Sequence, residues 1–596
     1  DIRNATYETS TANAANDTRS YTSVNLGATI TPIKNWNIDF DYTYANNQNT
    51  SWRPGTSFYA GNAWASAVNV AGAANISNEW DQYNQLGATL VPKVLNVTRY
   101  TASGTNPDHV YRDSYTSQQQ TLNITTYYDM QFGDHKIKPM LGMNGVDYEN
   151  EGNWSQITRL MDYTNPQFAL ATGTQTAGGG FAWNSTLGFF GRLNYSYKDK
   201  YLLEANGRYD GTSKFPSDLQ WRWYYSFSGG WRVTEEPWMK DLKSIVNSLK
   251  IRASWGKIGD QSVASSLYIP LMNKNTSAWI HDKEKDIYYS TPDAVAVGVT
   301  WQDIQTLDIG FDARIYNDFG ITFDWYRRDT KNMIVPAEGI GYGFGTSAPK
   351  GNYGNLRTNG YEIQIDYGHI FSNGLSVSFT GTLADAKTKI TKYGTGRITG
   401  NWYNGKTYGE IWGYKVDRLF QNDDFERDAN GKLIKVTSKD GYTVYKFTDQ
   451  NMATQGKLNS GSLIFGPGDV KYKDLNGDGV INNGSNTVED HGDLTVIGNT
   501  TPRYEYSFRF DFGYKGWDLS MFWQGIGKRD MWGSSPLTLA GYNSSDGAMA
   551  QAIAGDFWYE TVENGQVVDA NYNAFYPRAA NTGGGSTFNM EVSDKY

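Results

Sequence analysis

The sequence predicts an all-β protein built as a transmembrane antiparallel β-barrel. Three features carry this prediction: apolar and polar residues alternate along most of the 596 residues, the connections are either very short or very long, and aromatic residues, 15% of the chain, flank the short ones. Alternation places apolar side chains on one face of a strand and polar side chains on the other. The mean hydropathy of −0.60 is consistent with a barrel, because alternating strands score as polar.

The strand prediction depends on segments in which every second residue is aromatic or aliphatic. Several of them, at about nine to eleven residues, have the length needed to cross a bilayer when tilted. No window approaches the 18 apolar residues of a membrane-spanning helix, and polar residues interrupt the nearest one, at 64–76. In chain order the segments are 36–44, 122–130, 193–197, 249–255, 307–315, 361–367, 504–512 and 517–523.

The connections divide into two classes by length. Five are short Gly/Asn/Asp turns, at 133–136, 198–200, 316–320, 372–374 and 513–516. Tyr, Trp or Phe flanks each turn, as in the aromatic girdle of a membrane barrel. Two are very long, at about 45–121 and 388–502, and we expect them outside the cell. The sequence therefore predicts one partial barrel over 1–596 with long extracellular loops.

Composition excludes several classes of function. The chain has no cysteine and five histidines, which excludes a disulfide scaffold, a thiolate zinc site and a cysteine nucleophile. The net charge of −9 contains no basic block, so no nucleic-acid partner is expected. Glu235 and Glu236 are adjacent in a predicted strand and point to opposite faces, so they cannot flank one scissile bond. We find no catalytic residues and expect no enzyme.

A series of local motifs carries a resemblance to a known family. The motifs are GRLNY at 191–195, RYDGTSKF at 208–215, GWRV at 230–233, LKIRASWG at 249–256, NGYE at 359–362, GPGD at 466–469 and DLNGDGVI at 474–481. In order and spacing, the set closely resembles the SusC/RagA family of TonB-linked outer-membrane transporters of Bacteroidota. The resemblance extends over nearly the whole chain.

The resemblance implies a fold, a function and partners. The fold would be a 22-stranded barrel of the TonB-dependent transporter type, with the N-terminal plug and the last strands expected to be absent from this chain. The function would be TonB-dependent import of oligosaccharides across the outer membrane, with peptide import of the RagA type as an alternative. A SusD-like surface lipoprotein would be the partner, in a dimer of transporter–lipoprotein pairs. A secreted soluble β-propeller or sandwich that binds or hydrolyses glycans is the alternative of another class.

One segment matches the first half of a calcium loop. Asp474, Asn476 and Asp478 supply oxygens at positions 1, 3 and 5, Gly479 occupies position 6, and Val480 offers a backbone carbonyl at position 7. We therefore expect a structural Ca²⁺ that rigidifies a long external loop. An Asn/Gly/Asp turn on a solvated loop is the alternative interpretation.

A calcium ion needs a further carboxylate to close its shell of six to eight oxygens. In an ordinary loop this ligand would be residue 485, which here is Ser485. The segment 493–498 resembles the corresponding segment of the family, and this resemblance implies Asp493 as the ligand after an insertion, with Glu489 or Asp490 as alternatives.

The predicted external segments are rich in Trp, Tyr and Asn. Flat rings beside amides suit the faces of sugars, and they equally suit a protein partner. For that reason the substrate-binding residues stay unknown, and no single residue is assigned as a substrate ligand. The aromatic residues in question are Trp52, Tyr59, Trp64, Trp80, Trp402, Tyr403, Tyr408, Trp532 and Tyr542.

Overall fold

The computed structural model describes most of the chain as β-structure. Fifteen strands are assigned to one large antiparallel sheet. The chain divides into two compact units, which are described separately. Across the described residues, no helix has the length and apolar character needed to cross a membrane. The described residues are 6, 10, 13–55, 57–61, 97–101, 109–162, 164–265, 267–337, 341–394, 398, 402–459, 463–531, 555–579 and 594.

The first unit contains residues 1–130, 138–191 and 208–214. Its long strands pair in the order β1-β2-β5-β7, and apolar residues lie opposite one another across the ladder, as Phe40, Ile124 and Met143 do. Its elements are β1 (Asn16–Ile33), β2 (Trp36–Arg53), β3 (Ser57–Gly61), β4 (Val97–Thr101), β5 (His109–Tyr128), most of β7 (His135–Thr158) and η1 (Phe168–Leu170). Three strands, β6 (Met130–Phe132), β8 (Gln175–Tyr197) and β9 (Tyr201–Thr212), have residues in the second unit or in both.

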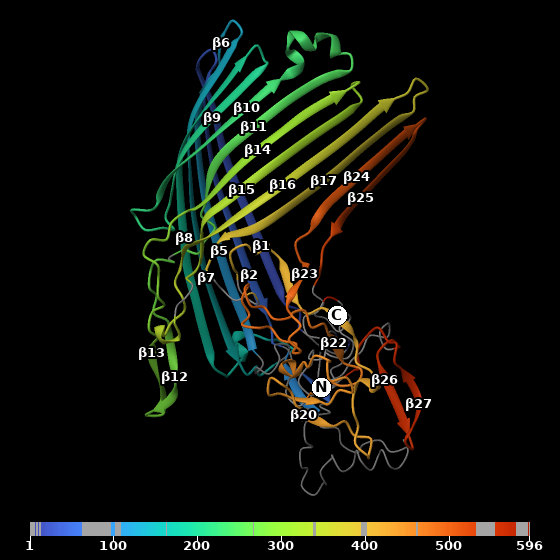
Figure 1. Cartoon of the computed structure of the whole chain (residues 1–596). Helices are drawn as coiled ribbons and strands as arrows, with labels where there is room; N and C mark the ends of the chain where they lie inside the picture. The colour runs from blue at the N-terminus through green and yellow to red at the C-terminus, as the bar shows by residue number, and fades with distance from the viewer. Residues whose placement is uncertain are drawn as a thin grey trace. The chain divides into compact units, whose positions relative to one another are not determined.

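The second unit carries eight further strands of the sheet, each hydrogen-bonded to the next along the chain (Figure 1). They are β10 (Trp221–Arg232), β11 (Val246–Asp260), β14 (Gln302–Ile315), β15 (Phe319–Pro336), β16 (Lys350–Ile370), β17 (Ser376–Lys392), β24 (Arg503–Tyr514) and β25 (Trp517–Lys528). Between them lie the 3-10 helices η2 (Val233–Glu235), η3 (Pro237–Leu242) and η4 (Tyr342–Phe344) and the hairpin of β12 (Lys274–His281) and β13 (Glu284–Tyr289).

The short turns lie where the sequence predicts them. Lys198 and Asp199 join β8 to β9 with φ of 53° and 51°, and Lys515 and Gly516 join β24 to β25 with φ of 46° and 88°. Positive φ at both central residues is the requirement of the two-residue turn whose twist matches paired strands. Local sequence thus sets these hairpins.

The strands are longer than the nine to eleven residues expected, and this changes the loop boundaries. β2 runs to Arg53 and β5 begins at His109, so the first long connection is shorter than 45–121. β17 ends at Lys392 and β24 begins at Arg503, close to the predicted 388–502. Strand pairing therefore continues beyond the apolar segments.

The segment between β17 and β24 folds into small elements of its own. Three hairpin-like pairs form, β18 with β23, β19 with β22 and β20 with β21, and β26 pairs with β27 further along the chain. The elements are β18 (Glu410–Gly413), β19 (Val416–Leu419), η5 (Asn422–Asp424), β20 (Lys435–Thr437), β21 (Thr443–Tyr445), η6 (Gly456–Leu458), β22 (Val470–Tyr472), β23 (Thr495–Asn499), β26 (Tyr559–Glu563) and β27 (Gln566–Asn571). We call residues 393–502 and 555–579 together the folded loop.

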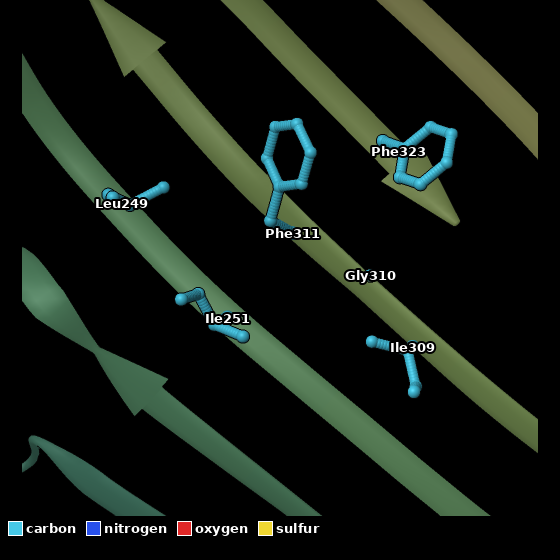
Figure 2. A pocket seen from close by; sticks show the side chains of 6 residues that line it. All are labelled: Leu249, Ile251, Ile309, Gly310, Phe311 and Phe323. Atoms are coloured by element: carbon cyan, nitrogen blue, oxygen red, sulfur yellow. The ribbon is translucent and has the colours of Figure 1, made fainter. Parts of the chain in front are cut away.

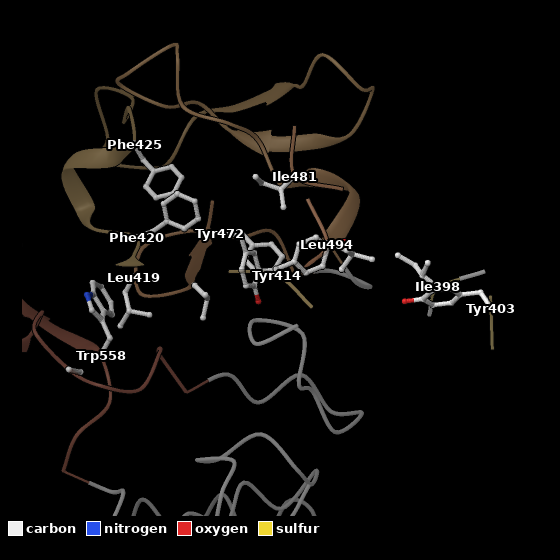
Figure 3. Packing of buried hydrophobic residues seen from close by; sticks show 13 residues of the cluster. Ile398, Tyr403, Tyr414, Leu419, Phe420, Phe425, Tyr472, Ile481, Leu494 and Trp558 are labelled. Carbon is white, nitrogen blue, oxygen red and sulfur yellow. The ribbon is translucent and has the colours of Figure 1, made fainter. Parts of the chain in front are cut away.

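The largest buried hydrophobic cluster lies in the folded loop. Phe420 and Phe425 pack with ring centroids 5.2 Å apart, and Ile481, Tyr472 and Trp558 belong to the same cluster (Figure 3). In contrast, large apolar side chains on the long strands stay exposed. Burial away from water is what stabilises an apolar side chain, so the folded loop has its own core, whereas the sheet leaves an apolar surface for a non-aqueous environment.

Candidate functional site

The apolar face of the sheet is continuous across neighbouring strands. Ile251 of β11, Ile309 and Phe311 of β14, and Phe323 of β15 line a shallow apolar groove, and their side chains project from adjacent strands (Figure 2). Ile251 and Ile309 are 43% and 45% exposed. A patch of this kind on a protein surface marks contact with a partner or a membrane.

Charged residues end the apolar face. On β15 the same face carries Phe323 and Trp325 and then Arg327 and Asp329, and Asp329 accepts from Arg327 at 2.9 Å and from Arg357 of β16 at 2.6 Å. On β14 the apolar row from residue 307 to residue 315 covers eight steps, about 26 Å along the strand. This length is comparable with the apolar band of outer-membrane barrels, about 25 Å tall.

The opposite face carries a network of charges. The Arg252 guanidinium of β11 lies 2.5 Å from Asp324 of β15, 3.2 Å from Asp312 and 3.7 Å from Asp308 of β14. Between the two β14 aspartates, a side chain on Gly310 would begin 2.2 Å from Asp324 Oδ1, so the close approach requires glycine. Three carboxylates around one guanidinium make this face hydrophilic and acidic, as a water-filled interior requires.

Two ion pairs hold the folded loop together. Arg578 donates from Nε and Nη2 to the two oxygens of Asp469, each at 2.8 Å, and Asp469 is fully buried. Arg418 donates to both oxygens of Asp424 at 2.6 Å, and the Gln421 N–H adds a bond of 2.8 Å. Burial raises the pKa of Asp424, but these donors lower it more, so its pKa lies below the ordinary value.

The predicted calcium loop forms tight turns that its own carboxylates cap. Asp474 accepts from the backbone N–H groups of Gly477 at 2.7 Å and Gly479 at 2.9 Å, and Asp478 accepts from Val480 N–H at 2.8 Å. Asn476 Oδ1 accepts from Asp478 N–H at 3.0 Å. The oxygens at positions 1, 3 and 5 therefore point back to the loop backbone.

Of the candidate closing carboxylates, Asp493 lies against the loop. It is fully buried and accepts from the N–H groups of Leu475 and Asn482, each at 2.8 Å. Burial raises its pKa, and the charges of Asp474 and Asp478 add to the rise. Asp490 instead accepts from Ser485 N–H at 2.9 Å. Within the described residues, no group of three or more His, Cys, Asp or Glu side chains converges tightly enough to hold an ion.

Glu235 and Glu236 have separate partners. Glu236 accepts from Trp231 Nε1 at 3.1 Å and lies 3.4 Å from Lys200, whereas Glu235 pairs with Lys243 at 3.0 Å. They do not face a common point. The predicted strand is wrong here, because Glu235 ends the 3-10 helix η2 and Glu236 lies between η2 and η3, which Pro237 begins.

The aromatic residues of the predicted external segments have different environments. Trp402 and Tyr408 are exposed and stack on each other, with ring centroids 5.4 Å apart and planes at 17°. Tyr403 is buried, and its hydroxyl donates to Glu410. Trp52 packs against a small buried cluster in the first unit. Tyr59 is in β3 but its side chain is not described, and Trp64, Trp80, Trp532 and Tyr542 lie outside the described residues.

A cavity of about 190 Å³ brings together residues that sequence reasoning missed. Lys387 of β17, Arg503 of β24 and Lys528 of β25 line it with Glu410 of β18 and the neighbouring Thr407. Nothing in the local sequence marks these residues, because strand pairing alone brings positions 387 and 528 to the same place.

Comparisons with known proteins agree with the strand pattern. Residues 2–546 match the family model described as TonB dependent receptor-like, beta-barrel. The chain is 26% identical over 453 residues to the TonB-dependent receptor SusC of Bacteroides thetaiotaomicron. This aligned region covers 74% of this chain and 40% of that protein. It is 28% identical over 344 residues to the TonB-dependent receptor P26 of Formosa agariphila. This aligned region covers 56% of this chain and 31% of that protein.

Among solved structures, the RagAB peptide importer in its open-open state is similar with a TM-score of 0.61 at 14% identity. The similarity covers 86% of this chain and 47% of that chain, and at this identity it concerns the fold alone. The chain spans less than half the length of these three relatives.

Proposed function

This chain belongs to the family of TonB-dependent receptor-like β-barrels, and from that premise we propose that it forms part of an active importer of oligosaccharides in the outer membrane. The observation that carries the proposal is the family match over residues 2–546, together with a sheet that has one apolar and one charged face. The all-β antiparallel prediction is confirmed. The propeller or sandwich fold of the alternative is wrong, because fifteen strands form one antiparallel sheet and residues 2–546 match a β-barrel family.

The two faces of the sheet support transport of a hydrophilic cargo. The apolar face, with Ile251 and Ile309 exposed, suits acyl chains, because lipid removes it from water. The face that carries Arg252 and its three aspartates suits a hydrated passage. The energy for uphill import would come through TonB.

An oligosaccharide is the cargo that the folded loop favours. Trp402 and Tyr408 offer exposed flat rings, to which the apolar face of a sugar can stack, and Lys406 Nζ lies 5.4 Å from the Trp402 ring centroid. A peptide is the second candidate, since the fold is similar to that of the RagAB peptide importer. The similarity to SusC and RagAB also supports a SusD-like surface lipoprotein as partner, in a dimer of transporter–lipoprotein pairs.

The test is purification from outer membranes in mild detergent, followed by mass spectrometry and an uptake assay. We expect a stoichiometric lipoprotein to co-elute and labelled oligosaccharide to enter cells only while the proton gradient is intact. The Trp402→Ala and Tyr408→Ala double variant should reduce oligosaccharide capture but not assembly. Uptake that survives collapse of the gradient would show a passive pore instead.

We also propose that Ca²⁺ binds the loop of Asp474, Asn476, Asp478, Val480 and Asp493. The supporting observation is the raised pKa of buried Asp493, caused by its burial and by the charges of Asp474 and Asp478. A divalent cation would neutralise the negative charge of Asp474, Asp478 and Asp493 if these carboxylates rotated away from the backbone N–H groups from which they now accept hydrogen bonds. Its role would be to rigidify the folded loop.

The calcium proposal is tested by thermal unfolding with and without EDTA. EDTA should lower the unfolding temperature of the wild type but not of the Asp474→Ala/Asp478→Ala variant. Asp449→Ala is the matched control, because Asp449 caps a similar turn of the folded loop through Asn451 N–H at 2.9 Å. An unfolding temperature of the wild type that does not respond to EDTA would contradict calcium binding.

A further inference from the structure

We propose that the cavity lined by Lys387, Arg503 and Lys528 binds a carboxylate-bearing terminal group of the cargo. The cavity lies where β17, β24 and β25 meet the β18–β23 pair of the folded loop. The inference rests on the proposed function in one respect only: the ligand is assumed to be part of the imported cargo. The binding site itself is argued from the cavity and its charges.

The strand register concentrates positive charge at this point. Arg503 and Lys528 are directly opposite each other in the β24–β25 ladder. Arg503 is already neutralised, because its guanidinium donates to both oxygens of Asp385 on β17, with Nη2 at 2.5 Å from Oδ2. Lys387, two residues beyond Asp385 on the same strand, and Lys528 have no ion-pair partner among the described residues. Two exposed ammonium groups therefore face the cavity uncompensated.

The acidic residue in the cavity wall is committed to other groups. Glu410 accepts from Thr407 N–H and from Trp412 Nε1, each at 3.0 Å, and from the Tyr403 hydroxyl. These bonds fix the carboxylate in the wall and hold it away from the lysines. The cavity wall thus carries two lysines without an ion-pair partner and one carboxylate that is already hydrogen-bonded, in a chain whose net charge is −9.

Hydrogen bonds make the opposite wall rigid. Thr501 Oγ1 and Asn499 Nδ2 both donate to the Tyr408 carbonyl at 3.0 Å, so the end of β23 is tied to the segment before β18. A wall that does not reorganise lowers the cost of ordering a ligand. The cavity is therefore formed before any ligand arrives.

Size and charge together define the ligand. The volume of about 190 Å³ is below the roughly 300–1,000 Å³ of pockets that enclose a drug-sized molecule. It suits one terminal unit of a longer chain. Lysine binds anions as a compact point charge, and a carboxylate from a terminal uronic acid or from the C-terminus of a peptide presents the same chemistry.

The experiment is isothermal titration calorimetry of the protein in detergent at low salt, with two matched pairs of probes. One pair is digalacturonate and the neutral disaccharide galactobiose, and the other is N-acetyl-trialanine and the neutral N-acetyl-trialanine amide. We expect the acidic member of at least one pair to bind at least tenfold more tightly than its neutral counterpart. The pair that shows the preference identifies the source of the carboxylate, and the preference should weaken as salt is added.

The Lys387→Gln/Lys528→Gln variant should lose this preference, while Lys389→Gln, which removes the same charge from the same strand outside the cavity lining, should keep it within about twofold. Equal binding of the acidic and neutral probes, or an equal loss in the Lys389→Gln control, would overturn the proposal. A wild type that shows no preference but keeps gradient-dependent uptake of neutral oligosaccharides would reject this site alone. A wild type that shows the preference but no uptake would reject the importer alone.

Discussion

Replacing Arg578 by leucine should loosen the folded loop without affecting the sheet. The substitution removes two hydrogen bonds of 2.8 Å from Asp469, a fully buried carboxylate that also accepts from the Gly466 N–H at 2.8 Å. Removing one partner of a buried ion pair costs about 3–5 kcal/mol. Arg578 is 35% exposed, so water can partly replace it. We therefore expect a loss of about 2–3 kcal/mol in the local free energy of opening.

Amide hydrogen exchange measures this local opening. The Phe420 and Gly468 amides are suitable reporters, because Phe420 N–H donates to the Asp469 carbonyl and Gly468 N–H donates to the Phe420 carbonyl, each at 2.8 Å. A loss of 2–3 kcal/mol corresponds to exchange about 30- to 140-fold faster, since each 1.4 kcal/mol is a factor of ten. Strands of the sheet, such as β15, should exchange as in the wild type.

Two variants show whether the buried charge is the cause. Asp469→Asn combined with Arg578→Leu removes the buried charge but keeps an acceptor for Gly466 N–H, so it should restore most of the protection. Arg427→Leu, which changes an exposed arginine of the same folded loop, should have little effect. The reasoning is refuted if Arg578→Leu leaves the exchange rates unchanged, or if the double variant exchanges as fast as the single one.

Two further predictions concern pH and the two faces of the sheet. Because bonds to Arg418 and to backbone N–H lower the pKa of Asp424 despite its burial, its stabilisation is present above the unfolded pKa of about 3.9 and is lost as the pH falls through the lower folded value. Asp424→Asn should therefore weaken hydrogen-exchange protection of the folded loop more at pH 6 than at pH 3, and an equal loss at both would contradict this. The chain has no cysteine, so single spin labels can be placed at Ile309→Cys and Thr322→Cys. In liposomes, the first label should be accessible to oxygen and the second to a water-soluble nickel complex; the same accessibility for both would contradict a lipid-facing and a water-facing side.

Hairpins and faces were predictable because both are encoded locally. The alternation around residues 307–315 fixes which side chains share a face, and a one-residue slip in pairing would invert them. The Lys198–Asp199 turn likewise follows from Asp199, a residue type that tolerates positive φ, and from the strands on either side. These features need no information from distant parts of the chain.

The ends of the strands were not predictable in the same way. Residues 45–53 belong to β2, yet they include Asn46, Asn47, Gln48 and Asn49, which are polar on both faces. Beyond the apolar band a strand no longer shows alternation, although its backbone continues to pair, as it does with β5. The sequence pattern indicates which part of the surface is apolar, but it does not indicate where the pairing of strands ends.

The sequence alone determined that this is a β-sheet protein with one apolar face, short turns, long loops and the motifs of its family, because strand period and turn chemistry act between near neighbours. Only the tertiary structure decided which distant residues meet: Arg578 with Asp469, 109 positions apart, and Lys387 with Lys528 around one cavity. Such contacts depend on strand register and on the folding of the loop around its own core. The alternation of apolar and polar residues along the chain does not predict these long-range contacts.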